Sequence, residues 1–210
     1  MKKIQFKKQL FFLSICLLVF ACKEVDPNKQ IDEGYVSDQV YTSKEIGWQI
    51  LIPNGWDIVT KEQSDQYSER GKEIFKEGLG VEIDDSQLKD LISFKKNQFN
   101  IFISSSEPFK EDFEGEWEQN NADLKYYLYE MFKNNGVNVD STATTTVRID
   151  GLDFKRYGFT IKKTSGEVIL NQLMYIKLIN GHSFSVNINY NNERDKKVML
   201  KALFDSQFRK

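Results

Sequence analysis

The strongest constraint on this fold is a series of short turns in the C-terminal half of the chain. Asp150-Gly151, Ser165-Gly166 and Asn180-Gly181 each place glycine second in a pair of turn-forming residues, which is the pattern of tight β-hairpins. The segments between them, from about residue 144 to 190, are rich in β-branched and aromatic residues. Strands joined by such turns must be antiparallel. We therefore expect a four-strand antiparallel meander.

Two strands of this meander have informative patterns. In 152–162 the apolar positions change parity between Phe154 and Tyr157, which predicts a bulge near Tyr157-Gly158. The segment 168–179 is apolar at both odd and even positions. Such a strand should lie at the centre of a sheet that is covered on both faces.

The remaining elements follow from hydrophobic periodicity and turn residues. Before the meander we expect a strand at 48–52 with Trp48, Ile50 and Ile52 on one face, a helix at 61–79, and a hairpin of 91–94 and 99–103 around Lys96-Asn97. A second helix should follow, ending at Asn135-Gly136 and bearing the apolar residues Leu124, Leu128, Met131 and Phe132. After the meander we expect a last helix from about 193 to 204. Helices on both sides of a mostly antiparallel sheet give an α+β fold, a three-layer α/β/α sandwich. No second linker is evident, so we expect residues 41–210 to form one domain.

This layout resembles the Mog1/PsbP-like family. The features that carry the resemblance are Gly47-Trp48 to Pro53-Asn54-Gly55-Trp56, the Asp150-Gly151 hairpin, the strand and turn from Gln172 to Gly181, and the C-terminal helix. The likeness covers about residues 41–208. It implies a Mog1/PsbP-like globular domain of the kind found in binding or assembly accessories and in many bacterial lipoproteins. No catalytic motif is carried over.

The first 22 residues differ from the rest of the chain. Four lysines precede a 12-residue apolar run, Leu10 to Ala21, with Ser14 as its one polar residue. This run is shorter than the roughly 20 residues that a membrane-spanning helix needs, and it matches the apolar region of a secretory signal. The run ends at Val19-Phe20-Ala21-Cys22, which looks like a bacterial lipobox, although Phe20 is bulkier than the strict pattern. The alternative is an ordinary cleaved signal in which Cys22 is incidental.

The lipobox resemblance predicts a signal peptide at 1–21 and a lipid-modified Cys22. It implies a diacylglycerol thioether on Cys22 and an acylated new N-terminus, with fatty acids such as palmitate. Lys23 stands where an inner-membrane lipoprotein usually has Asp, so the resemblance favours a lipid-anchored protein of the outer membrane of a Gram-negative bacterium, periplasmic or surface-facing. The polar segment 22–40 has no periodicity, and we expect it to be a flexible tether.

Charge and cysteine content exclude several classes of function. The whole chain has 29 basic and 31 acidic residues, and removal of residues 1–21 leaves 25 basic and 31 acidic residues, a net charge of −6. Such a protein is not attracted to nucleic acid. Cys16 leaves with the signal and Cys22 is acylated, so we expect no disulfide, no cysteine-based metal site and no cysteine nucleophile.

The chain lacks the motifs of common active sites. His182 is the one histidine and follows a turn, and the chain has no Gly-x-Ser-x-Gly elbow, so a Ser–His–Asp triad is not expected. It also has neither of the two common phosphate-binding motifs, Gly-x-x-x-x-Gly-Lys-Ser/Thr and Gly-x-Gly-x-x-Gly. One histidine without a free thiol cannot supply the three or four ligands of a zinc site. We therefore predict no metal, no cofactor and no enzymatic activity.

Acidic and aromatic residues leave a few alternatives open. Six carboxylates within 107–118 could bind Ca²⁺, but a solvated acidic loop before a helix is the preferred interpretation. Asp84-Asp85 could belong to a carboxylate-dependent hydrolase, although adjacent acids are far more often simply exposed. Trp56 and Trp117 lie beside polar residues and are candidate contacts for a partner or ligand; alternatively they cover the ends of the sheet.

These features predict a membrane-anchored, non-enzymatic lipoprotein that binds an unknown protein of the cell envelope. The alternative is a glycan or small-molecule binding module that uses Trp56 and Trp117, and a hydrolase is less favoured. Tyr126, Tyr127 and Tyr129 are expected to hold their helix against the sheet rather than to bind a cofactor.

Overall fold

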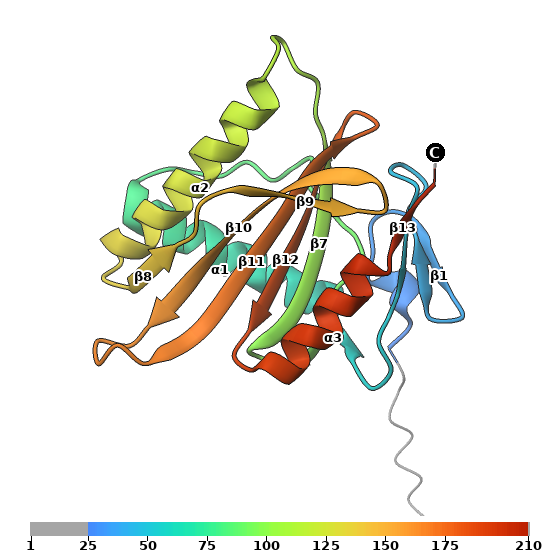
Figure 1. The fold of residues 1–210 in the computed structure, drawn as a ribbon, viewed down its shortest axis with the longest axis horizontal. Helices are drawn as coiled ribbons and strands as arrows, with labels where there is room; N and C mark the ends of the chain where they lie inside the picture. The colour runs from blue at the N-terminus through green and yellow to red at the C-terminus, as the bar shows by residue number, and fades with distance from the viewer. Residues whose placement is uncertain (1–24, 210) are drawn as a thin grey trace, which may run out of the picture.

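A large antiparallel sheet forms the centre of the computed structural model, which describes residues 25–209 (Figure 1). The predicted signal peptide 1–21 and Cys22 lie outside the described residues. The sheet has nine strands in the order β4-β6-β7-β12-β11-β10-β8, with β5 beside β7 and β9 beside β10. Their bounds are β4 Asp57–Ile58, β5 Lys89–Asp90, β6 Phe94–Asn97, β7 Asn100–Pro108, β8 Asn138–Ser141, β9 Thr145–Ile149, β10 Leu152–Lys162, β11 Val168–Ile179 and β12 His182–Tyr190.

The meander of β9 to β12 confirms the prediction from the turns. Asp150 and Gly151 have φ of 44° and 78°, and Asn180 and Gly181 have φ of 50° and 73°. Two successive positive φ values define the type I′ turn that suits the twist of paired strands. The middle connection runs from residue 163 to 167 and includes Ser165-Gly166, so β10 and β11 have the predicted bounds of 152–162 and 168–179.

The predicted bulge at Tyr157-Gly158 is wrong. Tyr157 pairs with Met174 and Gly158 with Leu173 without a break, and the register shift lies between Ile161 and Lys162. Around Tyr157 the other edge of β10 changes partner instead, from β9 to β8. Apolar residues of both parities occur in β10 because both faces of the sheet are covered.

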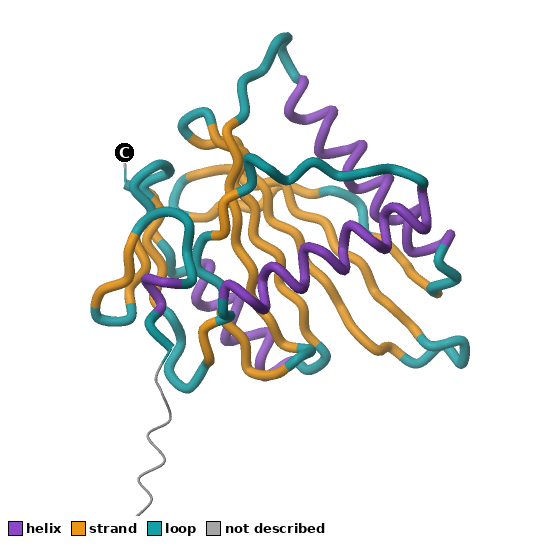
Figure 2. Tube along the Cα trace, turned by 180° about the vertical axis from the view of Figure 1, so that it is seen from behind, coloured by secondary structure: helices purple, strands orange, loops and turns teal. Residues whose placement is uncertain are grey.

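Three helices cover the two faces and complete the expected three-layer sandwich. The helix α3 (Glu193–Phe204) lies on the face seen in Figure 1, and α1 (Lys61–Leu79) crosses the opposite face, seen in Figure 2. The helix α2 (Glu116–Asn134) packs beside α1 and beside β8. None of these helices, within the described part of the chain, is long and apolar enough to cross a membrane.

Each face of the sheet has its own hydrophobic core. The larger core joins the sheet to α3 and contains Trp48, whose indole is fully buried and donates a 2.9 Å hydrogen bond to Ser206 Oγ. The smaller core lies under α2. Its buried members are Trp117, Val139, Tyr157, Phe159, Met174 and Ile176.

The N-terminal helix and hairpin match their predictions closely. The bounds of α1 agree with the predicted 61–79, and Gly80 follows with φ of 67°. The hairpin of β6 and β7 is present, but its turn lies at residues 98–99, later than predicted. The helix α2 begins at Glu116, well before its apolar positions become periodic.

A small second sheet was only partly expected. Its order is β1 (Tyr35–Ser37), β2 (Val40–Thr42), β3 (Trp48–Leu51) and β13 (Gln207–Phe208). The strand at 48–52 is confirmed, and Trp48, Ile50 and Ile52 are all buried. The other three strands, β1, β2 and β13, were not predicted.

Residues 26–37 form a strap that is bound to the domain. The strap begins with a 3-10 helix (Pro27–Lys29) and ends with β1. The Asn28 side chain accepts from Val36 N at 2.7 Å and donates to Val36 O at 3.0 Å. The Asp32 carboxylate accepts from Lys61 Nζ and from Asp90 N, both at 2.8 Å. The predicted flexible tether over 22–40 is therefore wrong from residue 27 onward, because the Asn28 bonds fold the segment on itself and the Asp32 bonds tie it to α1 and β5.

Candidate functional site

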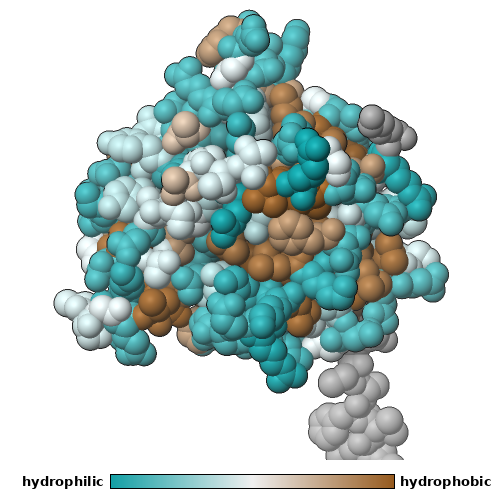
Figure 3. All heavy atoms as spheres, in the orientation of Figure 1, coloured by the Kyte–Doolittle hydropathy of each residue, from teal (hydrophilic) through white to brown (hydrophobic). Residues whose placement is uncertain are grey.

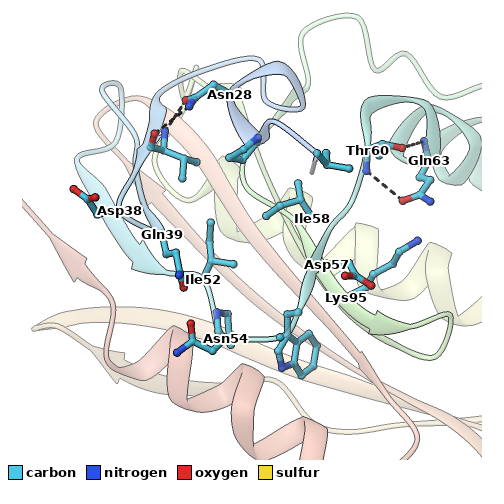
Figure 4. Close-up of a pocket in the computed structure, with 16 residues that line it drawn as sticks. Asn28, Asp38, Gln39, Ile52, Asn54, Asp57, Ile58, Thr60, Gln63 and Lys95 are labelled. Carbon is cyan, nitrogen blue, oxygen red and sulfur yellow. Dashed lines mark hydrogen bonds between the residues drawn. The ribbon is translucent and has the colours of Figure 1, made fainter. Parts of the chain in front are cut away.

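A pocket of about 910 Å³ opens between the strap, the end of β3, β4 and the start of α1 (Figure 4). Its volume is within the range of small-molecule sites. It is lined by Val25, Pro27, Asn28, Val36, Asp38, Gln39, Ile52, Pro53, Asn54, Gly55, Trp56, Asp57, Ile58, Thr60, Gln63 and Lys95. The strap supplies one wall, so this pocket exists only because the strap is ordered.

The inner part of the pocket is apolar. In Figure 4 the side chains of Ile52 and Ile58 point into the space between β3 and β4. Trp56 is partly buried and packs edge-on against Phe94, with ring centroids 5.8 Å apart at 89°. This contact fixes the indole while leaving part of it on the pocket. Trp56, a candidate contact residue from the sequence, thus lines this pocket.

The rim of the pocket is polar and nearly neutral. The side-chain amides of Gln39 and Asn54 are exposed, and within the described residues they make no hydrogen bond with the protein. Asp57 and Lys95 are cross-strand neighbours on β4 and β6. The lining includes two carboxylates, Asp38 and Asp57, and the ammonium of Lys95, and the Lys96 ammonium bonds to Gly55 O at 2.7 Å. The rim therefore offers hydrogen-bonding groups without an excess of positive charge.

A capping box orders the α1 side of the pocket. Thr60 N donates to Gln63 Oε1 at 3.2 Å, and Gln63 N donates to Thr60 Oγ1 at 3.3 Å. Lys61 N donates to Gln30 Oε1 of the strap at 2.8 Å. These bonds satisfy the first amides of the helix, so this wall is held by the protein itself.

The prediction that Trp117 is an exposed contact residue is wrong. Trp117 is 4% exposed and belongs to the smaller core. Its Nε1 donates to Ser183 Oγ on β12 at 3.2 Å. Trp117 thus anchors the start of α2 to the sheet. This agrees with the alternative interpretation from the sequence, in which Trp117 covers the sheet.

The outward side of α2 carries the exposed aromatic residues. Tyr126 and Tyr127 are 60% and 48% exposed, with ring centroids 5.8 Å apart, and Leu124, three residues before Tyr127 on the same helix, is exposed as well. The expectation that Tyr126 and Tyr127 hold the helix against the sheet is wrong, whereas Tyr129 packs against the smaller core. We call Leu124, Tyr126 and Tyr127 the α2 surface.

A second apolar area reaches the surface beside α3. On the face shown in Figure 3, hydrophobic residues gather next to this helix. The exposed Phe204 lies edge-on to Tyr175, with ring centroids 6.1 Å apart at 89°. This area is the outer edge of the larger core, to which Tyr175 belongs, so packing of the fold accounts for it.

His182 lies in a polar cluster beside the junction of the two sheets. Its Nε2 is 3.4 Å from Glu45 Oε2, and its Nδ1 is 3.0 Å from Asn180 O. Lys89 Nζ pairs with the other Glu45 oxygen. Among the described residues, the partners of the imidazole are thus a carboxylate and a backbone carbonyl, not the serine hydroxyl that a triad needs.

The acidic segment 107–118 is explained by local hydrogen bonds. Glu116 accepts from Asp112 N at 2.6 Å, and Glu111 accepts from Trp117 N at 3.2 Å, so both order the approach to α2. Glu107, half-buried on β7, is the exception, and burial raises its pKa above 4.5. Within residues 25–209 no group of three or more metal-ligating side chains could hold an ion.

Asp84 and Asp85 are held as carboxylates. The Ser86 amide hydrogen-bonds to Asp84 and lowers its pKa. Lys72 and Ser68 bond to Asp85 and lower its pKa. A hydrolase needs one acid with a raised pKa, so this pair does not suit the hydrolase alternative.

Comparison with known proteins identifies the fold. No family model matches the chain, and no curated protein matches it significantly. The solution structure of cyanobacterial PsbP (CyanoP) from Synechocystis is similar, with a TM-score of 0.54 and 11% identity over 81% of this chain and 92% of that chain. The chain has a PsbP-like fold. The fold prediction is thereby confirmed, and at this identity the likeness concerns the fold alone.

The strap side of the pocket was not predicted, because residues 22–40 were interpreted as a tether. One signal was present: Asp38-Gln39 stands between Tyr35-Val36 and Val40-Tyr41, a turn pair between β-forming residues. The structure gives both turn residues positive φ, 50° and 63°. That hairpin places Gln39 on the pocket.

Proposed function

We propose that this protein is a non-enzymatic binding module of the cell envelope, held by lipid on Cys22. The observation that carries the proposal is the combination of a lipobox-like end at Cys22 with a folded PsbP-like body that begins within a few residues of it. Each buried CH₂ contributes about 0.8 kcal/mol, so two or three acyl chains hold such a domain firmly at a membrane. Lys23 favours the outer membrane of a Gram-negative cell, with the domain periplasmic or surface-facing.

The partner we propose is another envelope protein, and the α2 surface is the contact. Exposed tyrosines are typical of protein interfaces because they offer a large rigid area and a hydroxyl group. Carboxylates such as Glu114, Glu118 and Asp123 lie close by in the sequence and are exposed. A complementary partner surface would have an apolar centre and a basic rim.

Capture from membranes tests this proposal. The acylated protein should retain a stoichiometric partner, and Tyr126→Ala/Tyr127→Ala should lose it without unfolding, because both side chains are largely exposed. Tyr35→Ala is the matched control, since Tyr35 is a 45% exposed tyrosine on the small sheet. Equal capture by the wild type and the double variant would refute the role of the α2 surface.

Anchoring has a separate test. Cys22→Ser should leave the domain folded and release it from membranes, and mass spectrometry should find acyl groups on the mature N-terminus. An unmodified mature N-terminus would refute the lipid anchor.

A second candidate function is the binding of a glycan or small molecule in the pocket. The observation that favours it is the position of Trp56. Its ring packs edge-on against Phe94 and lines the pocket together with the side chains of Gln39 and Asn54. A thermal-shift screen with envelope sugars tests it, because a ligand at 100 times its Kd adds about 2.7 kcal/mol of stability.

A further inference from the structure

The pocket lies close to the proposed lipid anchor. Val25 is part of the pocket lining and follows Cys22 by three residues. Three residues span at most about 10 Å even when fully extended. A flexible tether over 22–40 would have allowed several times that distance, but the strap bonds begin at Asp26 and remove this freedom.

This distance keeps the pocket at the level of the lipid headgroups. The headgroup layer on each side of a bilayer is about 5–8 Å thick. A domain anchored at Cys22 therefore has its pocket beside that layer. Groups in the layer therefore reach the pocket at a high effective concentration, which raises its occupancy beyond what the affinity of the pocket alone gives.

The chemistry of the pocket selects among headgroups. Asp38 and Asp57 offset Lys95 and Lys96, whose ammonium donates to Gly55 O at 2.7 Å, so the rim has no net positive charge to attract a phosphate. The exposed amides of Gln39 and Asn54 both donate and accept hydrogen bonds. Trp56 and Ile52 provide an apolar surface, against which the C–H face of a sugar ring can pack.

We infer that the pocket binds the neutral, hydroxyl-rich headgroup of a glycolipid in the membrane that holds the protein. Trp56 receives the face of the sugar ring, and Asn54 and Gln39 bond its hydroxyl groups. This inference rests on the proposed anchoring at Cys22, and it names the ligand class of the second candidate function.

Vesicle flotation of the mature chain with Cys22→Ser tests the inference, because this chain contains every element of the structure and lacks the anchor. The probes are vesicles of phosphatidylcholine alone, with a neutral glycosyl diacylglycerol, or with phosphatidylglycerol; a soluble disaccharide serves as competitor. We expect binding to the glycolipid vesicles, about tenfold weaker for Trp56→Ala. Asn54→Ala, at an exposed turn position, should weaken binding without disturbing the Phe94 contact. Phe113→Ala is the matched control, since Phe113 is a 55% exposed aromatic residue outside the pocket lining, and it should bind like the parent.

Several results would overturn the inference. They are equal binding to vesicles with and without glycolipid, a preference for the anionic vesicles, or unchanged binding of both pocket variants. If the free disaccharide binds with the same affinity as the glycolipid in vesicles, the claim that the ligand comes from the membrane is refuted. If Cys22 is acylated and flotation is negative, this inference alone fails; if Cys22 is unmodified, the proposed anchoring fails, whatever flotation shows.

Discussion

Removal of the Asp32 carboxylate should release the strap from the domain. Asp32 Oδ2 accepts from Lys61 Nζ and from Asp90 N, each at 2.8 Å, and Oδ1 accepts from Lys61 Nζ at 3.0 Å. In Asp32→Ala these bonds are lost, although Lys61 keeps its ion pair with Asp90 at 3.2 Å.

The expected loss is moderate because the site is partly exposed. A hydrogen bond to a charged group contributes about 1.5–3 kcal/mol, and exposed ion pairs contribute about 0–1 kcal/mol. The Asp32 side chain is 35% exposed, so a local loss of about 1–2 kcal/mol is reasonable. That loss corresponds to an about 5- to 30-fold rise in local opening.

Amide hydrogen exchange measures this opening directly. The Val36 amide, bonded to Asn28, and the Gln30 amide, bonded to Pro27, should exchange about 5- to 30-fold faster in Asp32→Ala, whereas β11 amides should not change. Asp65→Ala on the exposed side of α1 is the control, because Asp65 makes no ion pair within the described residues. Unchanged exchange at Val36 and Gln30 would refute the argument that Asp32 holds the strap.

Three further perturbations test other parts of the structure. Ser206→Ala leaves the buried Trp48 indole N–H without its acceptor and should cost about 1–3 kcal/mol in urea denaturation; a loss below about 0.5 kcal/mol would contradict this. Burial raises the pKa of Glu107 above 4.5, so the stabilising contribution of this carboxyl is complete at lower pH and is lost as the pH rises through the raised value. The stability advantage of Glu107→Gln over the wild type should therefore grow from about pH 4 to about pH 7, and a constant difference would be inconsistent with this account. Gly34→Ala places Cβ 2.4 Å from Thr42 O at a φ of +82°, so it should be more destabilising in thermal unfolding than Gly166→Ala, which has a φ of +88° and open space; equal losses would show that the clash is relieved.

The meander and helix bounds were predictable because local chemistry decides them. Asp150-Gly151 and Asn180-Gly181 adopt the φ values that such pairs favour. Thr60 and Gly80 bound α1 through a capping box and a left-handed cap, both of which depend on nearby residues. These features need no knowledge of the rest of the chain.

The strap was not predictable, because distant partners hold it. Asp32 bonds to Lys61 and Asp90, which are 29 and 58 residues away. Taken alone, the segment is polar and has no hydrophobic periodicity, which is the composition of a tether. The pocket was missed for the same reason, since the strap forms one of its walls.

The errors at Trp117 and Tyr157 have a common origin. The acidic neighbours of Trp117 suggested exposure, but its indole reaches Ser183, 66 residues away. The change of parity at Tyr157 suggested a bulge, but it reflects cores on both faces of β10. In both cases tertiary packing overrode the local pattern.

The last strand, β13, has a consequence for the order of folding. Gln207 and Phe208 pair with β3 beside Trp48, and the ring of Phe208 stacks at 6.3 Å on the Trp48 indole. This corner therefore closes only after residues 207–208 have joined β3, which lies about 160 positions earlier in the chain. Its contacts have the greatest sequence separation in the fold, so we expect it to form late, after the meander, whose strands pair with near neighbours.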